Sequence, residues 1–198
     1  MPRAEFVTGL VLAAGGSSRL GQPKQLLEYG GTTLLGHVLS VARECPFDQL
    51  LCVIGGASVQ IRGSVNFDGV QVVENEVFGT GCSSSIAAAM QAVDPESSVM
   101  VLMLGDQPGV RTATVESLLA GRGDAPLAAC AYSDGRGHPL AFARSMFAEL
   151  RMLHGDKAVW KLMDSYTDDV ADVAVDGPIP RDVDTWQDYE ALGASQRS

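Results

Sequence analysis

The sequence predicts an α/β protein built on a single doubly wound, mostly parallel sheet with helices on both faces. Three observations predict this class: short apolar runs alternate with helical patterns, the runs are apolar throughout, and no repeat or linker divides the 198 residues. Strands that are apolar on both faces need helices on both sides, as in parallel sheets. A single domain of this length buries roughly 70% of its unfolded surface.

The expected strands and helices alternate along the first two thirds of the chain. Five apolar runs predict buried strands at residues 6–14, 49–55, 70–74, 98–105 and 126–132. Helical patterns lie between them at 32–44, 83–93 and 112–121. After residue 132 the pattern is irregular, and it predicts a strand at 138–143, helices at 144–153 and 155–166, a strand at 169–175 and a helix at 185–192.

Charge and composition exclude several classes of function. The formal net charge of −10 argues against a nucleic-acid partner, because phosphate backbones are held by basic stripes. No apolar run approaches the roughly 20 residues that span a bilayer, so we expect a cytoplasmic protein without a membrane partner. The four cysteines show no CxxC spacing, which indicates reduced thiols rather than a zinc site or disulfides.

A Gly/Ser-rich loop with two isolated cations follows the first expected strand. Gly15 and Gly16 allow backbone N–H groups to approach an anion closely, and Arg19 and Lys24 come next. Neither GxGxxG nor a Walker A motif is present. From the loop alone, a phosphate-binding loop and an ordinary turn with two solvated cations remain equally open.

Carboxylates occupy two positions suited to a cation. Asp106 lies at the carboxyl end of an expected central strand, where it either holds a metal ion or simply forms a turn. Asp182 and Asp184 point the same way in an extended segment and so could approach one cation. The alternative is that Asp184 or Thr185 caps the following helix.

Several other residues allow both a structural and a functional interpretation. Ser83–Ser85 start a helix, where they either contact a base or phosphate or cap that helix. A lone histidine such as His138 is more often structural than catalytic, and we expect at most a contact with an acceptor substrate. Trp160 and Trp186 are expected to pack rather than to stack on a ligand.

The segment LAAGGSSRLGQPKQLL resembles the signature LAxGxSxRxGxxKxLL of a nucleotidyltransferase family, the MobA-like proteins, which includes the molybdopterin guanylyl- and cytidylyltransferases. Every fixed position of the signature matches. Further segments are similar to family segments over nearly the whole chain: NEVFGTGCSSSI, GDQP, GHPLAF, LHGDKAVWKLM and DVDTWQDY. The chain departs from the family at Val159–Trp160 and at Trp186, in regions expected to face the acceptor.

The resemblance implies a nucleotide-binding part at about residues 1–110 and an acceptor-binding part at about 111–190, within one domain. It implies that the loop backbone wraps a triphosphate, that Arg19 holds the β- and γ-phosphates, and that Lys24 lies at the α-phosphate. Asp106 and Asp184 would bind Mg²⁺, and His138 and Asp182 would contact the acceptor. The residues implied to bind nucleotide are Leu12, Ala13, Ala14, Gly15, Gly16, Ser17, Arg19, Lys24, Asn75, Gly81, Ser83 and Ser85.

The loop sequence AAG, with Ala14 in place of glycine, resembles the cytidine-using branch of the family. The resemblance therefore implies transfer of CMP from CTP to the terminal phosphate of a molybdopterin-type cofactor, with release of pyrophosphate. A molybdenum hydroxylase is then a candidate protein partner. Three alternatives stay open: a sugar-phosphate nucleotidyltransferase, an NAD(P)H-dependent oxidoreductase of the nicotine-blue type, and a non-catalytic chaperone of the molybdenum cofactor.

Overall fold

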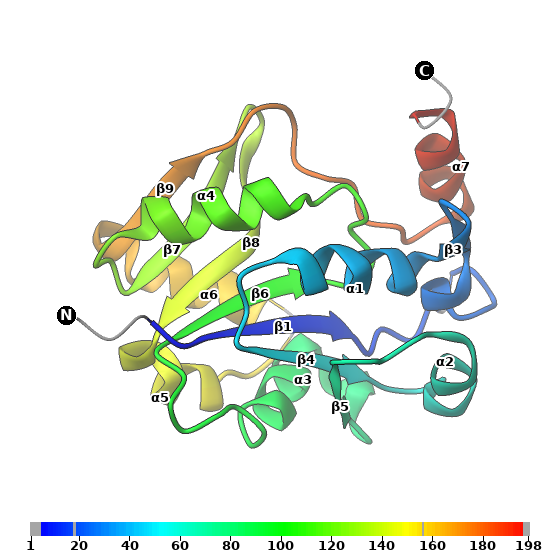
Figure 1. Cartoon of the computed structure of the whole chain (residues 1–198), viewed down its shortest axis with the longest axis horizontal. Coiled ribbons are helices and arrows are strands. Elements are labelled where there is room, and N and C mark those ends of the chain that lie inside the picture. Colours follow the sequence, from blue (N-terminus) through cyan, green and yellow to red (C-terminus); the bar gives the residue numbers. More distant parts are fainter. Residues whose placement is uncertain (1–4, 18, 156, 196–198) are drawn as a thin grey trace.

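The computed structural model describes residues 5–17, 19–155 and 157–195 and is organised around one seven-stranded sheet (Figure 1). The sheet has the order β5-β4-β1-β6-β8-β7-β9. Its strands are β1 (Val7–Ala13), β4 (Gln49–Ile54), β5 (Gln71–Glu74), β6 (Val99–Leu104), β7 (Leu127–Tyr132), β8 (Gly135–Ala143) and β9 (Val170–Ala174). A small antiparallel pair, β2 (Glu28–Tyr29) and β3 (Thr32–Thr33), lies apart from it.

The pairing of the strands confirms the predicted mostly parallel sheet. β1 pairs in parallel with β4 and β6, β4 with β5, and β7 with β9. β8 runs antiparallel to both of its neighbours, β6 and β7. The carboxyl ends of β5, β4, β1 and β6 therefore meet at one edge, which is where doubly wound sheets bind ligands.

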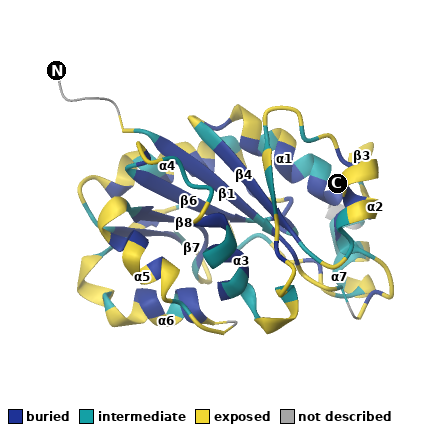
Figure 2. Cartoon of the chain, turned by 90° about the horizontal axis from the view of Figure 1, so that it is seen from below, coloured by how far each residue is buried: buried dark blue, intermediate teal, exposed yellow. Residues whose placement is uncertain are grey.

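Helices cover both faces of the sheet, and the side chains of each strand alternate between them. Val11 and Ala13 face the layer of α1 (Leu34–Glu44), α2 (Ser58–Ser64) and α4 (Thr112–Arg122). Leu10 faces the layer of α3 (Cys82–Ala89), α5 (Phe147–Arg151) and α6 (Ala158–Ser165). Figure 2 shows the strands buried between these layers, with exposed residues on the outer sides of α4, α5 and α6 and only buried and intermediate ones on α3.

A third, smaller apolar cluster joins the first loop to the end of the chain. Leu20, Leu27 and Leu34 pack with Val183, which precedes α7 (Trp186–Ser195). The backbone N–H of Val183 also donates to the carbonyl of Asp106, at 3.1 Å. The segment 182–184 is thereby fixed beside both the first loop and the end of β6.

Several predicted boundaries were wrong for local reasons. The helix expected at 32–44 begins at Leu34, because Thr32 and Thr33 pair in β3 and the hydroxyl of Thr33 accepts a bond from the N–H of Gly36. The helix expected at 83–93 begins at Cys82 and ends at Ala89. α2 was not predicted, because it has seven residues and buries only Ile61.

In the last third, the predicted elements are present but differ in extent. β8 begins at Gly135, ahead of the expected 138. The segment 144–153 forms a 3-10 turn, η3 (Arg144–Met146), followed by the short α5. In the segment 155–166 the helix α6 starts at Ala158, and Asp156 lies outside the described residues.

Three cysteines lie in the core: Cys52 and Cys130, which sit in apolar runs of the sequence, and also Cys45. Burial, joined at Cys45 by nearby glutamates, raises the pKa of Cys45 to about 11 and that of Cys52 and Cys130 to about 12. These thiols stay protonated near neutral pH and act as small apolar groups.

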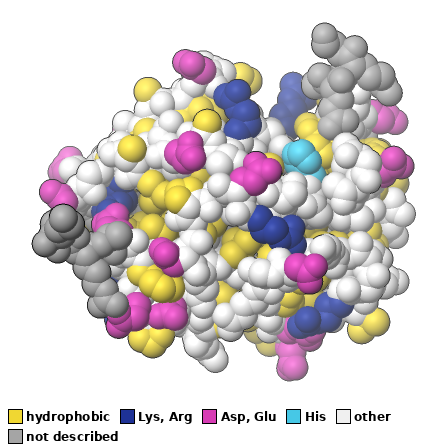
Figure 3. All heavy atoms as spheres, viewed as in Figure 1, with side chains coloured by type: hydrophobic (Ala, Val, Ile, Leu, Met, Phe, Trp, Pro, Cys, Tyr) yellow, Lys and Arg dark blue, Asp and Glu magenta, His cyan; other side chains and the backbone are white. Residues whose placement is uncertain are grey.

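The surface carries both signs of charge. On the face shown in Figure 3, Lys and Arg side chains lie singly among Asp and Glu and do not form a stripe. Among the described helices, none is long and apolar enough to cross a bilayer.

Candidate active site

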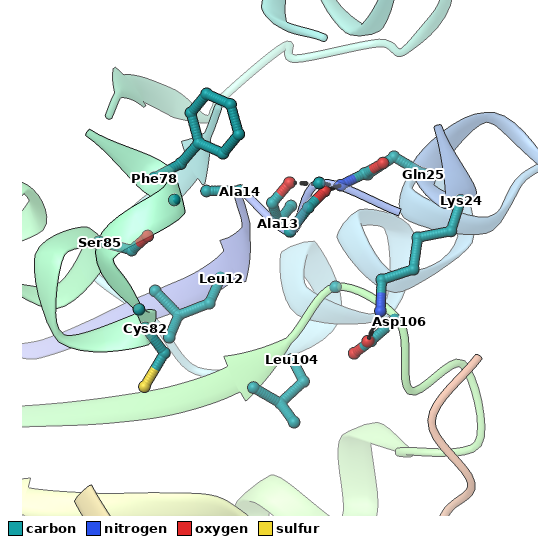
Figure 4. A pocket seen from close by; sticks show the side chains of 15 residues that line it. Leu12, Ala13, Ala14, Lys24, Gln25, Phe78, Cys82, Ser85, Leu104 and Asp106 are labelled. Carbon is teal, nitrogen blue, oxygen red and sulfur yellow. Dashed lines mark hydrogen bonds and ion pairs between the residues drawn. The ribbon is translucent and has the colours of Figure 1, made fainter. Parts of the chain in front are cut away.

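A cavity of about 330 Å³ opens at the carboxyl edge of the sheet (Figure 4). It lies between the loop after β1, the segment that leads into α3, and the end of β6. Its volume is in the range of small-molecule sites in enzymes. Nine of the residues predicted for the site line it: Leu12, Ala13, Ala14, Gly15, Gly16, Lys24, Gly81, Ser85 and Asp106.

Lys24 joins two carboxylates at one end of this cavity. It sits on the 3-10 turn η1 (Lys24–Leu26), and its Nζ contacts Asp106 Oδ2 and lies 2.8 Å from Asp184 Oδ1. Burial alone would lower the pKa of Lys24, but the charge of Asp106 and bonds to both carboxylates outweigh it and raise the pKa. The ammonium is therefore charged at any physiological pH.

The same geometry tests whether Asp106 and Asp184 could share a metal ion. Both carboxylates reach one nitrogen, so their oxygens are close enough to approach one cation. Within the described residues no group of three or more His, Cys, Asp or Glu side chains could hold a metal by itself. Mg²⁺ is commonly held by one or two carboxylates plus substrate phosphates, so this pair fits such an ion.

Asp182 and Asp184 have different partners although they are two residues apart. Gln107 Nε2 donates to Asp182 Oδ1 at 2.6 Å, whereas Asp184 contacts Lys24. Partial burial and the charge of Asp106 raise the pKa of Asp182, and the bond from Gln107 opposes this. Asp182 is thus bound to the turn after β6 and does not join the Lys24 cluster.

The capping alternative for Asp184 is resolved by the residues that follow it. Thr185 Oγ1 accepts from the N–H of Asp188 at 3.2 Å, and Asp188 Oδ2 accepts from the N–H of Thr185 at 2.8 Å. This reciprocal pair is a capping box at the start of α7. Since Thr185 supplies the cap, the carboxylate of Asp184 remains available to Lys24.

Arg19 and Ser17 lie at the rim of the site. The Arg19 side chain is 71% exposed, and its Nη1 lies 3.8 Å from Asp184 Oδ2. Ser17 has a positive φ of 49°, and its hydroxyl accepts from the backbone N–H of Lys24 at 2.9 Å. Ser17 therefore shapes the loop around Lys24, while the exposed Arg19, paired with Asp184, is placed to reach a ligand at the rim.

Gln25 is a site residue that the sequence analysis missed. Its buried side chain donates from Nε2 to the carbonyls of Ala13, at 2.7 Å, and Gly15, at 3.0 Å. These two bonds fix the backbone of the glycine loop. Figure 4 shows the contact with Ala13 as a dashed line. The sequence carried little signal for it, because Gln25 stands between the charged Lys24 and the two leucines that follow.

Like Ser17 and Arg19 at the rim, Asn75 and Ser83 were predicted to bind the nucleotide but do not line the cavity. Asn75 is buried, and its amide donates to Ser84 Oγ at 2.8 Å and to Ser85 Oγ at 3.0 Å. Its Oδ1 accepts from the N–H of Val77 at 3.0 Å. Ser83 Oγ accepts from the N–H of Gly155 at 2.8 Å. In this structure both side chains hold chain segments together.

His138 is enclosed on the α6 face of β8. Its ring lies edge-on to Trp160, with centroids 5.4 Å apart, and burial lowers its pKa to about 4. The imidazole is therefore neutral near pH 7. Trp186 is 45% exposed and lies edge-on to Tyr189, away from this pair.

Comparison with known proteins identifies the family. The model of the MobA-like NTP transferase domain matches residues 9–170. The nicotine blue oxidoreductase of Paenarthrobacter nicotinovorans is 31% identical over 142 residues, which are 68% of this chain and 69% of that protein.

Two solved mycobacterial structures share the fold along their whole length. The homologue of Rv0371c from Mycobacterium sp. strain JC1 is 48% identical, with a TM-score of 0.89 over 96% of this chain and 97% of that one. Rv0371c of Mycobacterium tuberculosis H37Rv in complex with manganese is 46% identical, with a TM-score of 0.87 over 96% of this chain and 99% of that one. Because the family model spans residues 9–170, most of the 198 residues, the chain belongs to the MobA-like NTP transferase family.

Proposed function

We propose that this protein transfers CMP from CTP to the terminal phosphate of a molybdopterin-type cofactor and releases pyrophosphate. The proposal narrows the nucleotidyltransferase chemistry of the family to one nucleotide and one acceptor. The observation that carries it is the cluster of Lys24, Asp106 and Asp184 at one end of an open cavity.

The reaction needs positioning and charge neutralisation more than covalent help from the protein. An oxygen of the acceptor phosphate forms a bond to the α-phosphorus, and the bond to the β-phosphate breaks with its electron pair leaving on pyrophosphate. Backbone N–H groups of Gly15 and Gly16 hold the triphosphate, and Gln25 keeps their loop in place. Lys24 neutralises the charge that develops on the α-phosphate in the transition state.

Asp106 and Asp184 are the residues that would hold the divalent ion. Bound there, Mg²⁺ would screen the phosphate charges and fix their orientation. The manganese in the crystal structure of the mycobacterial relative supports a divalent ion in this family. Arg19, exposed at the rim, would reach the β- and γ-phosphates, where its forked guanidinium suits two contacts at once.

The preference for CTP rests on Ala14. This buried residue lines the cavity directly before the two loop glycines, and its Cβ narrows the space beside the base. A pyrimidine needs less room than a purine. The acceptor would approach from the part formed by residues 111–190, where Asp182 lies beside Gln107.

An NAD(P)H-dependent oxidoreductase is the second candidate, and the name of the P. nicotinovorans relative favours it. The same cavity could take a dinucleotide. Its charged end argues for the transferase, because hydride transfer has no use for two carboxylates converging on a buried ammonium.

One assay separates the candidates. The protein is incubated with CTP, GTP or ATP, with and without Mg²⁺ and molybdenum cofactor, and pyrophosphate is measured; a parallel arm follows NADPH oxidation with nicotine blue. We expect pyrophosphate with CTP only when Mg²⁺ and cofactor are both present. NADPH oxidation without pyrophosphate would overturn the proposal in favour of the oxidoreductase.

A further inference from the structure

Phe78 is an aromatic residue at the site that neither the loop signature nor the charged cluster involves. It belongs to the 3-10 turn η2 (Phe78–Thr80) and lines the cavity next to the loop of Gly15 and Gly16. Figure 4 shows its ring beside Ala14, on the side away from Lys24 and Asp106. Because the charged groups define the triphosphate end, the ring lies where the other end of a nucleotide would reach.

The ring is held firmly from behind. A Cβ placed on Gly55 would lie 2.8 Å from Phe78 Cβ, and one placed on Gly56 would lie 2.5 Å from Phe78 Cζ. Real Cβ atoms do not approach so closely, so only glycine at these two positions lets the ring sit there. The ring therefore cannot retreat into the loop after β4.

Phe78 also borders a second cavity. This cavity of about 430 Å³, which reaches Ala57 on the side of α2, shares Gly15, Gly16, Gln25 and Phe78 with the first. The ring is only partly buried, and it borders both spaces. An aromatic ring that is held by its neighbours and still borders a cavity can stack on a flat heteroaromatic ring.

The network of Asn75 supports the same ring. Its amide bonds to Ser84, Ser85 and the N–H of Val77 tie the two ends of the segment that carries Phe78. Asn75 makes these bonds within its own segment and is not among the residues that line the cavity. Asn75 therefore has a structural role in the segment that carries Phe78.

We infer that the nucleobase of the substrate stacks on Phe78, which makes this ring a determinant of nucleotide affinity. The inference rests on the proposed function, since it assigns the base subsite of the same cavity. Stacking tolerates every base, so Phe78 supplies affinity while Ala14 limits size.

The test measures equilibrium binding of CTP and of inorganic tripolyphosphate, which has the charge but no base, each with Mg²⁺. Phe78→Ala should weaken CTP binding by roughly 10- to 100-fold, the scale of one stacked base, and change tripolyphosphate binding less than about 2-fold. Phe78→Trp should keep CTP binding. The matched control is Val77→Ala, because Val77 is the neighbouring residue and its side chain points to solvent, 61% exposed; it should bind both ligands as the wild type does.

Two further variants read out contact directly. In Phe78→Trp the added indole fluorescence, taken as the difference from wild type, should be quenched by CTP and unchanged by tripolyphosphate. Gly56→Ala should push the ring forward and weaken CTP binding, yet add little in the Phe78→Ala background, as expected for coupled residues.

The outcomes separate the inference from the function on which it rests. Equal CTP affinity in wild type and Phe78→Ala, with wild-type CTP binding intact, would overturn the stacking role alone. A wild-type protein that binds tripolyphosphate but no nucleoside triphosphate would overturn the proposed function and the inference together. Loss of binding for both ligands in a folded Phe78→Ala protein would make Phe78 a support of the phosphate loop instead.

Discussion

Polar side chains have different surroundings in the two halves of the sheet. At the carboxyl ends of β1 and β6, charged groups of Lys24, Asp106 and Asp184 meet beside an open cavity. On the β8 side, His138 is buried against Trp160 and is neutral near pH 7. The first arrangement can exchange its internal contacts for a ligand, whereas the second contributes to the core. The Lys24 cluster thus differs from His138 chiefly in bordering a cavity that a ligand can enter.

The largest effect is expected at the charged end. Lys24→Ala should lower turnover by about 10²–10³, because a donor to the charged transition state is worth roughly 3–4 kcal/mol. Pyrophosphate release at saturating CTP measures it, with Lys161→Ala on the outer side of α6 as a charge-matched control. Turnover within a few-fold of wild type would remove Lys24 from the chemistry.

Asp106→Asn should weaken binding of a divalent ion. Loss of one of two carboxylates should cost at least the roughly 10-fold that an outer-shell partner costs, and excess metal should partly restore activity. Titration with Mn²⁺, followed by the EPR signal of the free ion, tests this without an activity assay. Asp182→Asn is the comparison, since Gln107 holds that carboxylate; an equal loss in both variants would contradict the division of roles.

The β8 side should respond to pH through stability. His138 has a folded pKa of about 4, below its unfolded value near 6.5, so it contributes stability that is present above pH 6.5 and lost as the pH falls toward 4. Between pH 7 and pH 4.5 this loss is about 2–3 kcal/mol. Urea unfolding at the two pH values should show a smaller decrease for His138→Phe than for wild type. Equal decreases would mean that the imidazole is solvated.

The smallest effect concerns base choice. Ala14→Gly should reduce the preference for CTP over GTP by roughly 10-fold or less, the scale of one methyl group in a pocket. The measurement compares kcat/KM for CTP, GTP and ATP in wild type and variant. A wild type that uses GTP and CTP equally well would leave the transferase fold intact and refute the cytidylyl assignment.

The sequence by itself determined the class of the fold and the contents of the first loop. Alternation of apolar runs with helical patterns is local, so β1, β4, β5, β6 and β7 were predicted within a few residues. The order Gly15, Gly16, Arg19, Lys24 is also local. It forms the signature that resembles the family, and that resemblance implied the metal-binding role of Asp106 and Asp184. Whether these residues meet was left to the fold.

Only the tertiary structure decided which side chains share a site. Lys24 and Asp184 are 160 residues apart and meet because Val183 is buried against the first loop and bonded to Asp106. Asn75 turns into its own segment because Ser84 and Ser85 satisfy its amide, and Phe78 takes the wall of the cavity because Gly55 and Gly56 leave it room. Such contacts depend on the order of strands in the sheet and on packing between distant segments, and spacing along one chain carries neither.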